Sequence, residues 1–460
     1  MTLLLSLFSL WTVGAVILLL AGAVARRSFS TYEFSALAVF IGTSAIGFAL
    51  FFYSFVGVRF DIYSFAAIPV LLLVVMFSWY AMHPFNLREV VRPFSGNSRD
   101  LGFFGKLLFF GILIQFLWVI AQTLPYPVHS HDAVANYALK AKIFFEAGGI
   151  PRDFFSWSHI TVAHPDYPLL LPLAMTWVYV FTGLNDVLVR LLMPLFYAGL
   201  LVVFFSRVTD LFSRRYALLM TFLLATVPQV SDYATIIHAD LLLTAFVTIG
   251  ALYMMSYIRK GDNFHIMMAS FMMGSSLWIK NEAMVFSAVF AFVLLMFLLK
   301  TDKSARKKVF RDILRAAALM FFIAVPWFIV RASSGVVNVD LDLGSLTPAR
   351  VWENVKHIPT LLYLFQQEVF GPKKWNIFWV IFFATLLWKR KKLVSGEAGY
   401  LALFTGLSAL TYFGGYMAMT GENLYFYVNT TISRFMLHFS GIALLLSGYL
   451  LYDDVKKVWG

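Results

Sequence analysis

Long apolar runs dominate the chain, and short polar stretches separate them. Most runs approach roughly 20 residues, the length that crosses a bilayer core as a helix. A backbone inside lipid has to satisfy its own hydrogen bonds, which favours α-helices. The pattern therefore predicts an all-α, polytopic membrane protein of about thirteen transmembrane helices. The expected spans are residues 2–25, 34–56, 62–82, 103–124, 187–206, 216–231, 241–258, 264–279, 283–300, 314–331, 375–388, 397–419 and 433–452.

The basic residues predict the orientation of these spans. Lys and Arg gather in short connections, such as Arg26-Arg27, 300–308 and 389–392, and the positive-inside rule places such connections in the cytoplasm. The N-terminus is then outside and the C-terminus inside. The short apolar run 169–183 is expected to be a helix at the outer interface, because a further crossing there would put Arg207 outside.

Composition narrows the class of protein further. Hydrophobic residues make up 60% of the chain and charged residues 13%, against about 25% charged in soluble domains. The net charge of +12 lies in the connections rather than in a basic patch, so no nucleic-acid partner is expected. The chain has no cysteine, which excludes disulfide and thiol chemistry. No cleavable signal peptide is expected, since the positive charges follow the first apolar run rather than precede it.

The spans suggest two parts. Residues 1–102 are predicted to form an N-terminal three-helix membrane module with a cytoplasmic loop. Residues 103–460 are predicted to form a catalytic membrane domain with two large external loops, 125–186 and 332–373, of which the first is helical.

The most polar stretch of the chain is 126–168, with four His and four acidic residues between long apolar runs. Polar groups in such a setting are expensive and mark functional sites. Four more polar stretches fall on the same predicted outer side. Together with the core of the first stretch, 129–166, we expect them to line one cavity there. The four are 231–240, 280–282, 331–373 and 420–434.

The first candidate motif is the run from His129 through His131 to Asp132, which opens a predicted helix over 132–146. On this helix Asp132, Asn136 and Lys140 share one face, while Tyr137 lies on another. Asp132 is suited to cap the helix N-terminus. It is equally suited to act as a catalytic carboxylate, with His131 beside it. The candidate residues here are His129, His131, Asp132 and Tyr137.

Two further motifs carry imidazoles and carboxylates. Pro165 and Pro168 bracket Asp166 and Tyr167, which predicts an extended, rigid segment after His164, or alternatively a turn with solvated side chains. His238 and Asp240 open a later span, where the helix dipole favours the carboxylate. These two side chains could instead join His129, His131 or Asp166 around a divalent metal. No cofactor is required by these residues, and the metal is left open.

Cationic groups near the outer ends of spans form the last candidates. Lys280 and Glu282 flank a short turn, where they either neutralise each other or the lysine holds a phosphate. Arg331 and Arg434 are each expected at the outer end of a span, where they either snorkel to the interface or clamp a phosphate.

The order of these motifs resembles that of the GT-C glycosyltransferases. The likeness covers about 103–452 and is carried by Asp132-x4-Tyr137-Ala138-x2-Ala141, Gly148-Gly149, His164–Pro168 before an apolar helix, Asp186-x3-Arg190, Asp240, Lys280-Asn281-Glu282, Pro326-Trp327 and Arg434. It is nearest to the protein mannosyltransferases, the lipid A aminoarabinose transferases and the rhizobial-type lipopolysaccharide sugar transferases. This chain has Ala133 where many members carry Glu, and its three leading spans are unusual for the family.

The resemblance implies a polyprenyl-phosphate sugar donor and transfer to a glycan, lipid or protein on the extracytoplasmic face of the plasma (inner) membrane. Asp132 matches the first-loop catalytic Asp. Chemistry agrees, since a base has to take the acceptor proton and cations have to stabilise the departing phosphate. We expect an inverting transfer with Asp132 as base, assisted by His131 or Asp166, and with Lys280, Arg331 and Arg434 at the phosphate. Other pocket residues are His129, Tyr137, His164, Tyr167, His238, Asp240 and Glu282.

Three rival functions stay open. A transporter or lipid flippase would need charges deep within spans, for which Arg190 is the main candidate, or paired inverted repeats, which the sequence lacks. An O-antigen ligase or polymerase and a non-catalytic membrane assembly factor are the others. In every case membrane lipids are expected partners.

Overall fold

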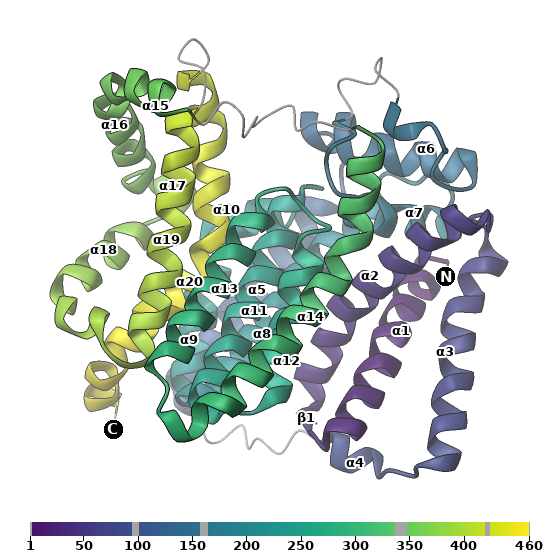
Figure 1. Cartoon of the computed structure of the whole chain (residues 1–460), viewed down its shortest axis with the longest axis horizontal. Helices are drawn as coiled ribbons and strands as arrows, with labels where there is room; N and C mark the ends of the chain where they lie inside the picture. Colours follow the sequence, from purple (N-terminus) through teal and green to yellow (C-terminus); the bar gives the residue numbers. More distant parts are fainter. Residues whose placement is uncertain (1, 94–100, 157–163, 336–346, 419–423, 460) are drawn as a thin grey trace. The chain divides into compact units, whose positions relative to one another are not determined.

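The computed structural model describes residues 2–93, 101–156, 164–335, 347–418 and 424–459 (Figure 1). Among these residues, nine helices are long and apolar enough to cross a membrane, and strands are confined to two short pairs of residues. The prediction of an all-α polytopic membrane protein is confirmed. The four remaining expected spans are helical as well and correspond to α9 (Arg214–Ala225), α12 (Asn263–Ser276), α18 (Phe378–Trp388) and α19 (Gly396–Ala418). Parts of the predicted polar stretches, 157–163 with His159, 336–346 and 420–423, lie outside the described residues.

The chain divides into two compact units. The first comprises 1–222 and 232–242, and the second comprises 223–231 and 243–460. This boundary differs from the expected one after residue 102, because α1 and α2 pack against later helices, α7 and α8. The separate role expected for residues 1–102 stays a prediction. Both units include residues of α9 (Arg214–Ala225), α10 (Pro228–Tyr233) and α11 (Ala239–Lys260).

The first unit is built on a close pair of antiparallel helices. A Cβ added to Gly14 of α1 would lie 1.8 Å from the carbonyl oxygen of Ala38 in α2, and one on Gly42 would lie 2.1 Å from that of Leu10. Small residues let helices approach this closely in membranes. The elements of this unit before α9 are α1 (Thr2–Ala25), β1 (Phe29–Ser30), α2 (Thr31–Val56), α3 (Ile62–Met82), α4 (Leu87–Val90), β2 (Val91–Arg92), α5 (Gly102–Thr123), η2 (Ala133–Ala138), α6 (Leu139–Ala147), η3 (Phe154–Ser156), α7 (Leu170–Thr182), η5 (Leu188–Leu191) and α8 (Leu192–Leu211).

The first unit has two distinct ends, separated by the length of α2, about 39 Å at 1.5 Å per residue. At one end, β1 and β2 pair in parallel, which joins the α1–α2 connection to the segment after α4. We call this the strand end. At the other end, the Phe60 amide donates to the Gly148 carbonyl, and the Ile150 amide donates to the Ser54 hydroxyl. We call this the α6 end, and Figure 1 shows α6 and α7 there, opposite α4.

Helix α7 corrects one expectation. The helix is present and too short to span, as predicted, but eleven of its thirteen residues are buried. It packs against α1, α2 and α6, and its Trp177 indole donates to the Ser6 carbonyl. An interfacial helix would expose one face to lipid headgroups. This one is enclosed, because it is apolar all round and other helices cover it.

In the second unit two helices run further than expected. Helices α14 and α20 exceed the expected spans 314–331 and 433–452, so the basic cluster 303–308 is helical and Arg434 lies inside α20 rather than at its end. A Cβ on Gly441 of α20 would lie 2.3 Å from the Thr248 hydroxyl, which marks a close approach to α11. The elements are α12 (Asn263–Ser276), α13 (Ala283–Lys300), α14 (Lys303–Ser333), α15 (Pro348–Asn354), η7 (Val355–His357), α16 (Ile358–Val369), α17 (Pro372–Trp375), α18 (Phe378–Trp388), η8 (Arg390–Val394), α19 (Gly396–Ala418) and α20 (Leu424–Trp459).

Candidate active site

The predicted helix after Asp132 is present, but its first turns are a π-helix. Residues 133–138 have this form, and the Leu139 amide donates to the Val134 carbonyl, five residues earlier. Such segments are rare and often occur at functional sites. Asp132 itself has helical backbone angles and makes no capping hydrogen bond, so the N-cap interpretation is wrong. Its side chain is 31% exposed and lies 3.5 Å from Nδ1 of His131, which is largely exposed.

The motif after α10 forms a buried imidazole–carboxylate pair. Nδ1 of His238 lies 3.3 Å from Oδ2 of Asp240, and its Nε2 lies 3.0 Å from the Ser130 hydroxyl. The ring of Tyr137, another predicted pocket residue, lies 6.1 Å from that of His238, centre to centre. Ser130 precedes His131 and Asp132, so this pair is joined directly to the start of the π-helical segment. Asp240 lies in the first turn of α11, as the dipole argument expected.

The segment from His164 to Pro168 is a turn rather than the expected extended segment. The Tyr167 amide donates to the His164 carbonyl at 2.9 Å, with Pro165 at the second position, where its fixed φ suits a turn. His164 has a φ of 41°, a left-handed conformation that is uncommon outside glycine. Its ring stacks on Tyr167 at 4.8 Å and lies 3.8 Å from the carboxylate of Asp166. Asp166 is fully buried, so this is not a turn with solvated side chains.

Lys140 completes this group and was not among the predicted site residues. Its Nζ donates to the His164 carbonyl at 2.6 Å and lies 5.6 Å from the centre of the Tyr167 ring. The side chain is fully buried. Burial lowers the pKa of Lys140 to about 7, although the Asp166 carboxylate acts in the opposite direction. The sequence signal was its place on the same helix face as Asp132 and Asn136.

Arg190 holds the backbone around this group. Its guanidinium donates to the carbonyls of Tyr126 and Pro127 before the π-helical segment and to that of Thr235 before His238. The side chain is buried, and Arg190 was not among the predicted site residues, although it is part of the Asp186-x3-Arg190 motif. A guanidinium that donates to three backbone carbonyls has a structural role, because it satisfies connections that leave the helices. Arg190 therefore positions the two segments that carry Asp132 and His238.

The structure does not bring all the predicted imidazoles together. His129 is exposed, and its Nδ1 lies 3.0 Å from the Pro127 carbonyl. Within the described ranges no group of three or more His, Asp or Glu side chains is placed to hold a metal ion. The divalent metal stays a prediction.

The second unit carries the predicted cationic group. Nζ of Lys280 lies 2.8 Å from the Glu282 carboxylate and is buried, as the self-neutralising interpretation expected. The Arg331 guanidinium donates to the Asn281 side chain at 3.2 Å. Arg434 and Glu282 both lie within electrostatic range of Tyr416. Short contacts thus join Lys280 to Glu282 and Arg331 to the neighbouring Asn281, and Arg434 belongs to the same unit.

An apolar cavity of about 230 Å³ lies next to the Arg434 position in this unit. It lies between α16, α19 and α20, and its lining includes Leu361, Phe365, Tyr416 and Phe435, the residue that follows Arg434. A cationic group beside an apolar cavity is suited to a phosphate that carries a long hydrocarbon chain.

Fold and side-chain content together define a polytopic, all-α membrane protein with acid–imidazole pairs at one end of its first unit. A family model described as dolichyl-phosphate-mannose-protein mannosyltransferase matches residues 163–329, a little over a third of the chain. The match supports a membrane glycosyltransferase of the GT-C type. It includes His164, Asp166, His238, Asp240 and Lys280 but not Asp132. No curated protein matches the chain.

Proposed function

We propose that this protein transfers a sugar from a polyprenyl-phosphate donor to a hydroxyl of a glycan, lipid or protein acceptor, with Asp132 as the general base. One observation carries the choice of base. Asp240 and Asp166 are fully buried, whereas Asp132 is partly exposed and is not used to cap its helix. A base has to reach the proton that it takes, and a partly exposed carboxylate is accessible to an acceptor hydroxyl whereas a fully buried one is not.

In the proposed reaction, Asp132 accepts the proton of the acceptor hydroxyl while that oxygen attacks the anomeric carbon of the donor. The bond between this carbon and the phosphate oxygen breaks, and the phosphate leaves with the electron pair. A single displacement of this kind inverts the anomeric centre. His131, 3.5 Å from Asp132, polarises the base, and Asp166 acts as a positioning residue through His164 and Lys140.

The leaving phosphate is assigned to the cationic group of the second unit. Arg331 and Arg434 are better suited than Lys280, because Glu282 already holds the Lys280 ammonium. The apolar cavity next to Arg434 is suited to part of the polyprenyl chain. Cations at a departing phosphate are a principal source of rate enhancement in such transfers.

Replacement of Asp132 tests the base assignment. Purified protein with Asp132→Asn should lose roughly 10²–10⁴-fold in transfer from extracted lipid-linked sugars, the range for removal of a general base, and should still bind the donor. Asp153→Asn is the matched control, because Asp153 is an exposed carboxylate of the same segment. Full transfer by Asp132→Asn would exclude Asp132 as the base.

The phosphate assignment is tested separately by Arg331→Gln and Arg434→Gln. Each should raise the KM for the donor, while Lys356→Gln, an exposed residue of η7, should leave it unchanged. An unaltered KM in both arginine variants would contradict the assignment.

We assign the α6 end to the extracytoplasmic face, on the basis of the positive-inside rule. Because the chain has no cysteine, single cysteines can report the side directly. In intact cells an impermeant maleimide should label Glu146→Cys at the α6 end and leave Arg88→Cys at the strand end unlabelled. The reverse pattern would contradict the assignment.

A further inference from the structure

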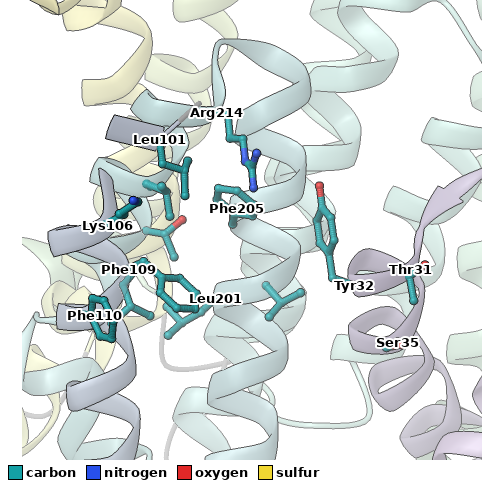
Figure 2. A pocket seen from close by; sticks show the side chains of 14 residues that line it. Thr31, Tyr32, Ser35, Leu101, Lys106, Phe109, Phe110, Leu201, Phe205 and Arg214 are labelled. Atoms are coloured by element: carbon teal, nitrogen blue, oxygen red, sulfur yellow. The ribbon is translucent and has the colours of Figure 1, made fainter. Parts of the chain in front are cut away.

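The strand end of the first unit holds a cavity that the proposed reaction does not use. Its volume is about 680 Å³, within the range of about 300–1,000 Å³ that is usual for small-molecule sites. It lies between α2, α5, α8 and α9, and all of its lining residues belong to this unit. Figure 2 shows the side chains that line it.

The lining is divided along the helix direction. Lys106 and Arg214 lie toward the end where α5 and α9 begin, near Leu101. One helical turn further along α5, Phe109 and Phe110 begin an apolar wall. The other apolar lining residues are Ile112, Leu201, Val202, Phe205 and Leu218.

This division matches the orientation of a phospholipid in a bilayer. The headgroup lies at the surface, where Lys and Arg side chains reach, and the acyl chains extend toward the middle. Phe109 and Phe110 are about half exposed, so the cavity opens sideways on the surface of a span that faces lipid. Tyr32 forms the opposite wall and packs against Phe205 at 5.9 Å between ring centres.

We propose that this cavity binds an anionic glycerophospholipid, with its phosphate between Lys106 and Arg214 and an acyl chain along the apolar wall. Basic pockets between transmembrane helices are suited to such headgroups. A zwitterionic phospholipid would make the same apolar contacts, but its headgroup has no net negative charge to attract the two cations. The site should therefore prefer an anionic lipid by about fivefold for each cation, or ~1 kcal/mol each.

Native mass spectrometry of the purified full chain tests this proposal. The probes are phosphatidylglycerol and phosphatidylcholine with the same acyl chains, titrated into detergent-solubilised protein. The wild-type protein should bind phosphatidylglycerol roughly 25-fold more tightly at one site, and a variant with both Lys106→Gln and Arg214→Gln should lose this preference. The control, Arg88→Gln with Arg215→Gln, removes the same charge from the same end outside the cavity and should keep it.

A second variant separates the cavity from the surface charge. In Val202→Trp the larger side chain should occupy the apolar part of the cavity. Binding of both lipids should then weaken, while both cations stay in place. Equal binding of the two lipids by the wild type, or an undiminished preference in the Lys106/Arg214 variant, would overturn the proposal. Displacement of the bound phosphatidylglycerol by polyprenyl phosphate at equal concentration would also overturn it, because the site would then belong to a lipid carrier.

Discussion

The two ends of the first unit bury their charges in different ways. At the strand end, Glu33 of α2 is held by Arg207 of α8 at 2.6 Å and by the Ser206 hydroxyl at 3.0 Å, and all three side chains are buried. At the α6 end, Lys140 is buried against a backbone carbonyl and an aromatic ring rather than in a close ion pair.

This difference separates a structural role from a chemical one. A closely paired buried acid and base satisfy each other's hydrogen-bonding groups and compensate each other's charge. A lysine without such a partner shifts its pKa instead, and shifted pKa values gather at functional sites. The strand end thus uses charge to join α2 to α8. The α6 end instead holds Lys140, whose pKa burial lowers to about 7.

The largest effect is expected from a substitution that breaks the buried ion pair at the strand end. Arg207→Met removes the guanidinium but leaves the Glu33 carboxylate buried, which should lower the free energy of unfolding by about 3–5 kcal/mol. Thermal unfolding in detergent measures the change. Glu33→Gln combined with Arg207→Met should recover part of the loss. A double variant as unstable as the single one would show that packing, rather than charge, dominates at this position.

The next effect concerns pH at the α6 end. The pKa of Lys140 is about 7 in the folded protein against an ordinary value of 10.5, so between these values the unfolded chain binds the extra proton. Stability should therefore rise with pH above 7, by up to ~1.4 kcal/mol per unit. Lys140→Met should lack this rise when unfolding is followed from pH 7 to 9. Parallel curves for wild type and variant would contradict the assigned pKa.

The smallest effect concerns the backbone at His164. A β-branched residue is strained at a φ of 41°, whereas Asn accepts it readily. His164→Val should therefore be about 1–2 kcal/mol less stable than His164→Asn in chemical unfolding. Both variants remove the ring that stacks on Tyr167, so this comparison isolates the backbone. Equal stabilities would argue against the turn geometry.

Much of the fold could be predicted because the backbone of each membrane span has to satisfy its own hydrogen bonds within the lipid. A run of about 20 apolar residues has few alternatives to a helix, and all thirteen expected spans correspond to helices. Helix ends were less predictable. Arg434 was placed at the end of a span, whereas α20 begins ten residues earlier, because polar residues continue a helix once other elements support it.

The sequence pointed to the candidate residues by type but did not predict their contacts, and their role as a site stays a prediction. Clusters of polar residues between apolar runs identified His164, Asp166, His238 and Asp240, which form two pairs at the α6 end. Lys140 was seen as part of a helix face, but its burial comes from a turn 24 residues away. The pattern of neighbouring residues in the sequence cannot predict a contact between residues that far apart in the chain.

The π-helical turn between Asp132 and Lys140 makes the helix one residue longer than an α-helical path would require. Excision of a single residue such as Ala135 would let this segment return to an α-helical path and would leave Lys140 on the face that meets the His164 carbonyl. Sequence alignments of this region should accordingly tolerate a one-residue gap here even where the lysine is kept.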